Sequence, residues 1–211
     1  MISDELQDLL LTYAEPENEL LAHIDRETHA KVLMPRMISG HYQGRVLSLL
    51  SKLCQPERIL EIGTFTGYAT LCLAEGLKEK GKIFTLDINE ELEDRVRGYF
   101  EKSPLNTKIE YIIGDARETL KTIKDEQFDL VFIDADKKNN GLYYDLVFNQ
   151  VRPGGLIIVD NVLWSGKVLK GAQDTDTKNI RTFNDKIAAD TRVEKLILPV
   201  RDGLFVIRKR L

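Results

Sequence analysis

The sixteen residues from Arg58 to Leu73, RILEIGTFTGYATLCL, constrain the fold more than any other part of the chain. The stretch opens with an apolar run, Ile59 to Ile62, that is typical of a buried strand, and apolar residues recur at helical spacing after Gly67. Gly63 and Gly67 lie in the turn, where glycine permits positive φ and lets a ligand touch the backbone. This pattern predicts a nucleotide-type ligand site at the carboxyl end of a first parallel strand, with Glu61 accepting hydrogen bonds from the ligand.

The spacing of the glycines indicates which class of nucleotide ligand the turn would bind. A dinucleotide fingerprint requires G-x-G-x-x-G, whereas this chain has Glu61-x-Gly63-x-x-x-Gly67, with Thr64 and Phe65 where the second glycine would stand. The pattern E-x-G-x-x-x-G resembles motif I of the class I S-adenosylmethionine (SAM) methyltransferases. The alternative is an ordinary turn between a strand and a helix.

Composition narrows the class of protein. The chain has 211 residues, 43% hydrophobic and 30% charged, which suits a single globular domain. A net charge of −4 gives no basic excess for a nucleic-acid partner. The N-terminus lacks the features of a signal peptide, and no apolar run approaches the length of a membrane helix, so we expect a cytoplasmic protein without a membrane partner. Cys54 and Cys72 lie in apolar helical patterns and are expected to be buried thiols.

The order of apolar patterns predicts a Rossmann-like, doubly wound α/β fold with a seven-stranded sheet and an N-terminal helical segment. We expect one domain over 1–211, with N-terminal helices in 1–55 and the α/β core in 56–211. A second helix is expected to begin at Pro16, and residues 34–37 interrupt the helical pattern. The predicted strands are 58–62, 82–87, 108–113, 128–133, 155–159, 194–199 and 203–208. The predicted helices of the core are 67–79, 90–101, 115–123, 139–150 and 177–190. The last two strands flank a turn signal at 201–203, which predicts an antiparallel hairpin.

Acidic residues follow the second and third predicted strands. Asp87 ends the second strand about twenty residues beyond the glycine turn, where a carboxylate accepts hydrogen bonds from both hydroxyls of a ribose. Asn89 is the better cap for the following helix, which favours a ligand role for Asp87. After the third strand, Gly114 allows close approach, and Asp115 either caps the next helix or binds an adenine amine.

Oxygen-bearing side chains follow the fourth and fifth strands. Asp134 comes directly after the fourth strand, and Asp160 and Asn161 come directly after the fifth. Because these strands are expected to be neighbours, their carboxyl ends would bring the three side chains together. Two carboxylates and an amide oxygen suit Mg²⁺, Ca²⁺ or Mn²⁺. Three separate helix caps or solvated strand ends are the alternative, and the shared edge favours a metal site.

Six motifs in combination resemble the cation-dependent O-methyltransferases, the group of caffeoyl-CoA and catechol O-methyltransferases. The resemblance extends from Met37 through the final hairpin. The motifs are Glu61-Ile-Gly-Thr-Phe-Thr-Gly-Tyr68, Leu86-Asp-Ile-Asn89, Gly114-Asp-Ala116, Phe132-Ile-Asp-Ala-Asp-Lys137, Gly154-Gly155 and Val159-Asp-Asn-Val-Leu-Trp164.

The resemblance implies roles for the matching positions. Asp134, Asp160 and Asn161 would bind the divalent cation, with Mg²⁺ expected first. Lys137 would act with Asp134 in catalysis, as general base or by positioning the phenol. Ser165 would meet the substrate, because it stands where plant members carry a substrate-contacting asparagine. Trp164 is a candidate substrate contact as a lid or stacking residue, with core packing as the equal alternative. The residues expected to bind SAM are Met37, Ser39, Glu61, Gly63, Thr64, Gly67, Tyr68, Ala69, Asp87, Ile88, Gly114, Asp115, Ala116 and Asp136. Ala69 departs from the family pattern, because many members have serine there.

The sequence therefore predicts a homodimeric enzyme that moves the methyl group of SAM to a hydroxyl of a catechol-type small molecule. Three alternatives stay open at this point. An NAD(P)-dependent oxidoreductase would share Asp87 but needs the missing glycine pattern. A nucleic-acid methyltransferase would need a basic face and a different motif after the fourth strand. An inactive binding module on the same fold is opposed by the intact metal and base positions.

Overall fold

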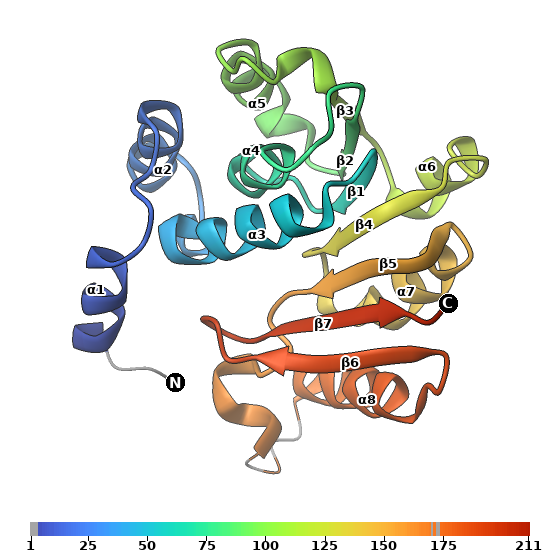
Figure 1. The fold of residues 1–211 in the computed structure, drawn as a ribbon. Helices are drawn as coiled ribbons and strands as arrows, with labels where there is room; N and C mark the ends of the chain where they lie inside the picture. Colours follow the sequence, from blue (N-terminus) through green and yellow to red (C-terminus); the bar gives the residue numbers. More distant parts are fainter. Residues whose placement is uncertain (1–3, 170, 172–173) are drawn as a thin grey trace. The chain divides into compact units, whose positions relative to one another are not determined.

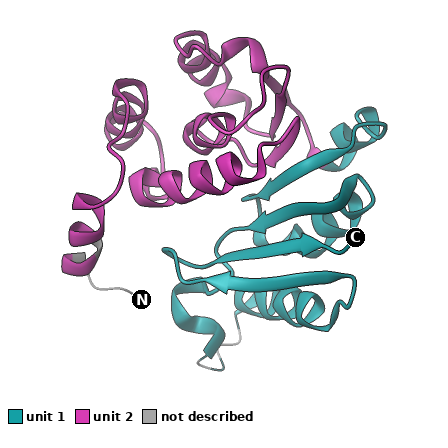
Figure 2. Ribbon diagram, viewed as in Figure 1, with its two compact units in different colours: residues 1, 117–211 teal, residues 2–116 magenta. Residues whose placement is uncertain are grey.

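The computed structural model describes residues 4–169, 171 and 174–211, and the chain divides into two compact units. The N-terminal unit extends to Ala116, and the C-terminal unit comprises Arg117–Leu211 (Figure 2). The single domain predicted for 1–211 stays a prediction.

The N-terminal unit contains three parallel strands in the order β3-β2-β1, and helices precede or follow them along the chain (Figure 1). The pairing register places Glu61 opposite Thr85, and Thr85 opposite Tyr111. Since paired residues of neighbouring strands share one face, these three side chains form a row across the sheet. The strands are β1 (Arg58–Ile62), β2 (Lys82–Asp87) and β3 (Ile109–Ile113). The helices are α1 (Asp4–Thr12), α2 (Glu19–Lys31), α3 (Gly40–Cys54), α4 (Tyr68–Ala74) and α5 (Glu93–Glu101), with short 3-10 turns at Pro35–Met37, Glu90–Leu92 and Asn106–Lys108.

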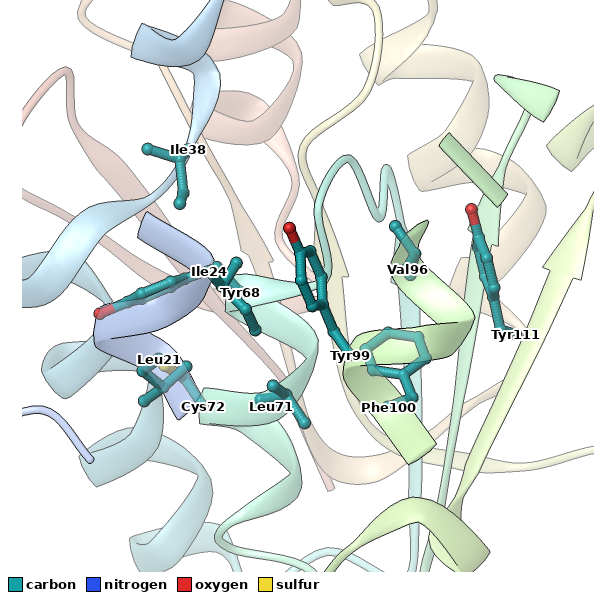
Figure 3. Packing of buried hydrophobic residues seen from close by; sticks show 10 residues of the cluster. All are labelled: Leu21, Ile24, Ile38, Tyr68, Leu71, Cys72, Val96, Tyr99, Phe100 and Tyr111. Atoms are coloured by element: carbon teal, nitrogen blue, oxygen red, sulfur yellow. The ribbon is translucent and has the colours of Figure 1, made fainter. Parts of the chain in front are cut away.

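Apolar side chains from α2, α4, α5 and β3 form one core of this unit (Figure 3). The rings of Phe100 and Tyr111 meet edge to face, with their centroids 5.7 Å apart. Gly67 has a φ of 79°, and a Cβ there would lie 2.6 Å from the Phe100 ring. The glycine turn is therefore packed against α5, and the core fixes its position. The members of the cluster are Leu21, Ile24, Ile38, Tyr68, Leu71, Cys72, Val96, Tyr99, Phe100 and Tyr111.

A charged cluster joins α3 to the end of α4. The Glu75 carboxylate accepts hydrogen bonds from Arg45 at 2.8 and 3.1 Å, from Ser48 at 2.7 Å and from Lys52 at 2.8 Å. Burial alone would raise the pKa of the Glu75 carboxyl, but the hydrogen bonds from these three residues outweigh it and lower the pKa to about 2. The folded state therefore favours the ionised carboxylate.

We expect Glu75→Gln to destabilise the fold by about 3 kcal/mol, because it leaves the half-buried Arg45 without its counter-charge. The lowered pKa adds a pH dependence. The contribution of Glu75 is fully present above the unfolded value of 4.5 and is lost as the pH falls from there toward 2. Denaturant unfolding near neutral pH and near pH ~3 measures both effects. Glu79→Gln, at an exposed position of the same region, is the control and should leave stability unchanged.

The C-terminal unit contains four strands in the order β4-β5-β7-β6. Strand β4 is buried along its whole length and pairs in parallel with β5, whereas β7 is antiparallel to both β5 and β6. The strands are β4 (Phe128–Ile133), β5 (Val151–Val159), β6 (Val193–Leu198) and β7 (Leu204–Lys209). The helices are α6 (Ala116–Thr122), whose first residue belongs to the other unit, α7 (Asn140–Phe148) and α8 (Thr175–Ala189), with 3-10 turns at Lys137–Asn139 and Trp164–Leu169.

The predicted α/β fold class with seven strands is confirmed, as are the neighbouring fourth and fifth strands and the final hairpin. Three predictions are corrected. The second helix begins at Glu19 rather than at Pro16, because the Asn18 side chain caps it by accepting from the Leu21 N–H at 2.9 Å. Strand β5 begins at Val151 rather than at 155, and Cys54 is only half-buried. Over the described ranges, no helix combines the length and apolar character that crossing a bilayer requires.

Candidate active site

A buried polar cluster lies where β1 enters the glycine turn. Glu61 is fully buried, and its Oε2 accepts hydrogen bonds from the hydroxyls of Thr70 and Thr85. The Thr85 hydroxyl also lies 2.6 Å from that of Thr64. These contacts fix the orientation of the Glu61 carboxylate at the ligand edge of the sheet. Sequence reasoning identified Glu61 and Thr64 but missed Thr70 and Thr85, which no spacing rule links to them.

Asp87 lies at the end of β2 and organises the turn beside it. Its carboxylate accepts the Phe65 N–H at 2.7 Å and the Asn89 N–H at 2.9 Å. Asn89 in turn accepts the Glu91 N–H at 3.0 Å and caps the short 3-10 turn. The predicted capping role of Asn89 is confirmed. The Asp87 carboxylate therefore has a structural role in addition to any ligand role, because the N–H groups of Phe65 and Asn89 both donate to it beside the glycine turn.

The other residues predicted to bind SAM differ in exposure. Met37 and Ile88 are exposed, whereas Ser39, Ala69 and Ala116 are buried, and Gly63, Gly67 and Gly114 have positive φ. Asp115 is half-buried and directly precedes α6. Tyr68 is buried at the start of α4, and its hydroxyl donates to Glu17. Burial, reinforced by Cys72 and Glu17, holds the pKa of this hydroxyl well above its usual range. Tyr68 is therefore a protonated donor near neutral pH.

The predicted cation ligands lie in the C-terminal unit, at the carboxyl ends of β4 and β5. Asp134 and Asp160 directly follow the paired residues Ile133 and Val159, and the Asp160 N–H donates to the Ile133 carbonyl at 3.0 Å. Asp160 is 3% exposed, and its Oδ1 accepts the Asn161 N–H at 2.7 Å. The structure thus brings the two aspartates to the same edge of the sheet.

Lys137 and Asp136 follow on the same segment. The Lys137 ammonium donates to Asp134 Oδ1 at 2.9 Å, and both side chains are mostly buried. Asp136 accepts the Asn139 amide at 2.6 Å and the Tyr143 hydroxyl at 2.8 Å. The proposed base is therefore next to a proposed cation ligand, whereas a contact between Asp136 and SAM stays a prediction.

Trp164 and Ser165 lie in the loop after β5. Both have a left-handed backbone, with φ values of 46° and 51°. The Ser165 N–H donates to the Asp202 carboxylate. Trp164 is half-buried, and among the described residues its indole N–H has no hydrogen-bond partner. A phenolic substrate at this position would supply an acceptor.

The chemistry of these donors fits a hard cation, although the structure does not show one. Two carboxylates and one amide are the oxygen ligands that Mg²⁺ accepts, and the lysine next to them is not a metal ligand. Within the part of the chain that is described, no group of three or more His, Cys, Asp or Glu side chains is arranged around a possible ion. Of the three predicted ligands, only Asp134 and Asp160 belong to these residue types, and the third is Asn161. The bound cation therefore stays a prediction.

Two amide side chains of this unit were missed at the sequence level, one on a buried residue and one on a half-buried residue. Asn140 is 1% exposed, and Asn184 on α8 donates from Nδ2 to the Val162 carbonyl at 2.8 Å. Neither residue belongs to a motif that the sequence singles out.

The seven-stranded sheet with Glu61 and Asp87 beside its glycine turn fits the class of SAM-dependent methyltransferases. A profile of the O-methyltransferase family matches residues 11–210, and the chain belongs to this family. It is similar to caffeoyl-CoA O-methyltransferase 1 of Nicotiana tabacum, with 36% identity over 92% of this chain and 84% of the relative. It is also similar to the caffeoyl-CoA O-methyltransferase of Medicago sativa, with 35% identity over 98% of this chain and 89% of the relative.

Solved structures agree with this assignment. The O-methyltransferase from Bacillus cereus in complex with SAH is 35% identical, covers 92% of each chain and gives a TM-score of 0.85. The O-methyltransferase TomG from Streptomyces achromogenes in complex with SAM is 26% identical, covers 100% of each chain and gives a TM-score of 0.91. The protein is therefore a SAM-dependent O-methyltransferase. The NAD(P)-dependent oxidoreductase alternative does not fit this family.

Proposed function

We propose that the enzyme depends on a divalent cation and methylates a hydroxyl of a catechol-type phenol. The observation that carries the proposal is the placement of Asp134 and Asp160 after paired residues of β4 and β5, with Asn161 next in the chain. Mg²⁺ is the favoured ion, and Ca²⁺ or Mn²⁺ would suit the same ligands. Two adjacent hydroxyls on one ring are the acceptor that best matches a cation held by only three protein ligands.

The relatives support the phenolic acceptor. The plant relatives are named for caffeoyl-CoA, whose aromatic ring carries two adjacent hydroxyls. Ser165, however, occupies the position at which plant members of the resembled group carry a substrate-contacting asparagine. We therefore extend the proposal to catechols in general and not to acyl-CoA esters.

Each residue has a distinct task in this proposal. SAM supplies an activated methyl group, and a bound divalent cation lowers the pKa of a hydroxyl that contacts it. Asp134, Asp160 and Asn161 hold the cation and so orient the phenol. The Lys137 side chain, 2.9 Å from Asp134, would accept the phenol proton in its neutral amine form or position the phenol as an ammonium. Trp164 covers the ring of the substrate. Orientation of acceptor and donor in line contributes several kcal/mol to the rate.

A panel of catechols and monophenols with labelled SAM tests the proposal. We expect methyl transfer to catechols in the presence of Mg²⁺, loss of transfer in EDTA and recovery when Mg²⁺ is restored. Monophenols should react poorly, because they offer the ion one oxygen. Full turnover in EDTA would rule out the cation, and equal turnover of monophenols would rule out catechol recognition.

Asp87 is proposed to bind the ribose hydroxyls of SAM. Removing a charged hydrogen-bond acceptor costs roughly 1.5–3 kcal/mol, so Asp87→Ala should weaken SAM binding about ten- to a hundredfold. Calorimetric titration with SAM measures the loss, with Asp94→Ala at an exposed position as the control. Unchanged affinity in Asp87→Ala would assign the carboxylate to the turn alone.

The remaining expectations stay predictions. These are a homodimer, the absence of nucleic-acid and membrane partners, and a cytoplasmic location. Exposed apolar side chains on α1 and α3, among them Leu9, Leu49 and Leu53, are consistent with a homodimer. Light scattering of the purified protein would decide its oligomeric state.

A further inference from the structure

The loop that follows β5 has an unusual backbone. Asn161, Trp164 and Ser165 all have positive φ, at 62°, 46° and 51°. Residues other than glycine rarely adopt this backbone conformation, and it persists only where neighbouring contacts hold it. The contacts that hold this loop therefore also determine where the proposed cation ligand Asn161 lies.

Asn161 is fixed by its neighbours on both sides. Before it, Asp160 Oδ1 accepts the Asn161 N–H at 2.7 Å. After it, the fully buried Val162 donates its N–H to the Gly203 carbonyl at 3.2 Å, and its carbonyl accepts Asn184 Nδ2 at 2.8 Å. Both peptide groups that border Asn161 thus donate a hydrogen bond, and the next peptide group accepts one from Asn184.

Two other elements of the C-terminal unit support the loop. In the turn between β6 and β7, the Asp202 carbonyl accepts the Leu163 N–H at 2.8 Å, and a Cβ on Gly203 would lie 2.5 Å from Leu163. On α8, Arg181 donates to the carbonyls of Lys167 and Val168 at 2.9 and 3.0 Å. Asn184 differs from Arg181 because it bonds to Val162, the residue that directly follows Asn161.

The Asn184 side chain makes a single defined bond. Its Nδ2 donates to Val162, and within the described chain its buried Oδ1 has no hydrogen-bond partner. A substitution that removes the amide therefore removes one hydrogen bond to the loop and leaves the rest of the network in place. Replacing Asn184 therefore tests the effect of this single hydrogen bond on the loop.

We propose that Asn184 is a positioning residue for the cation site, acting through the Val162 carbonyl on the orientation of Asn161. The inference rests on the proposed function, because it requires a divalent cation at Asp134, Asp160 and Asn161. Residues that orient metal ligands from outside typically change metal affinity about ten- to a hundredfold when they are replaced. Nothing in this role involves SAM.

The test compares Asn184→Leu, which is close in size and has no donor, with Asn179→Leu, at a half-buried position on the same helix. Mn²⁺ binding is followed by electron paramagnetic resonance, and SAM binding by calorimetry. We expect Asn184→Leu to lower Mn²⁺ affinity about tenfold, with SAM affinity unchanged. Asn179→Leu should match the wild type in both measurements.

The outcomes separate the two proposals. Failure of the wild type to bind Mn²⁺ would overturn the cation site and with it this inference. Wild-type binding with an equal Mn²⁺ affinity in Asn184→Leu would overturn the inference alone. Unfolding melts and SAM affinity verify that each variant is folded. If Asn184→Leu does not fold, Asn184→Ser, which is too short to reach Val162, takes its place with the same expected loss.

Discussion

Replacing Asp160 by asparagine is expected to reduce methyl transfer about a thousandfold while leaving SAM affinity unchanged. The substitution keeps the shape of the side chain and the acceptor for the Asn161 N–H, but it removes one of the two negative charges proposed to hold the cation. Loss of a Lewis acid removes several kcal/mol of stabilisation from the transition state, and each 1.4 kcal/mol corresponds to a factor of ten in rate.

Steady-state kinetics with a catechol and Mg²⁺ measure the loss of methyl transfer, and calorimetry with SAM measures the cofactor affinity. Asp185→Asn, an exposed aspartate on α8, is the control for a lost carboxylate that has no ligand role. Raising the Mg²⁺ concentration should restore part of the activity of Asp160→Asn, because the remaining ligands still bind the ion weakly. Wild-type turnover by Asp160→Asn would remove this residue from the cation site.

Replacing Lys137 by alanine is expected to lower kcat about a hundredfold, with a much smaller change in KM. Proton transfer by a positioned side chain contributes roughly 10²- to 10⁴-fold, and Lys137 is the amine that the structure places against Asp134. The neighbouring Lys138 is exposed, so Lys138→Ala is a matched control that should keep the wild-type rate.

Arginine at the same position separates the two roles proposed for Lys137. Arginine keeps the positive charge but cannot lose its proton, so Lys137→Arg should be as slow as Lys137→Ala if the lysine is the base. If the lysine only positions the phenol, Lys137→Arg should recover a large part of the rate. An unchanged kcat in Lys137→Ala would exclude both roles.

The strands were predictable because each carries its own pattern. Strand β4 is apolar at every position except Asp129, and its boundaries were predicted without error. Strand β5 was predicted too short, because Pro153, Gly154 and Gly155 look like a turn. In the structure Val151 still pairs with Phe128, across a shift in register that accommodates these residues. Pairing with a neighbouring strand therefore overrides the local turn signal.

The proposed cation ligands could be found from sequence for a related reason. Asp134, Asp160 and Asn161 each follow a strand directly, and neighbouring parallel strands end at the same edge. Thr70, Thr85 and Asn184 follow no such rule. Thr70 contacts Glu61 from a helix, and Asn184 contacts Val162 across 22 positions of the sequence. These partners are set by tertiary packing, which a single sequence does not encode in any spacing.

The left-handed backbone at Ser165 has a consequence for how this enzyme can diversify. Its N–H is tied to Asp202, so the main chain there keeps its shape while the exposed side chain varies. Asparagine and glycine tolerate this conformation, whereas branched residues such as valine do not. The position is thus open to the asparagine carried by the plant members and closed to bulkier branched residues. If Ser165 meets the substrate as proposed, a single substitution there would change acceptor preference without altering the main chain that carries it.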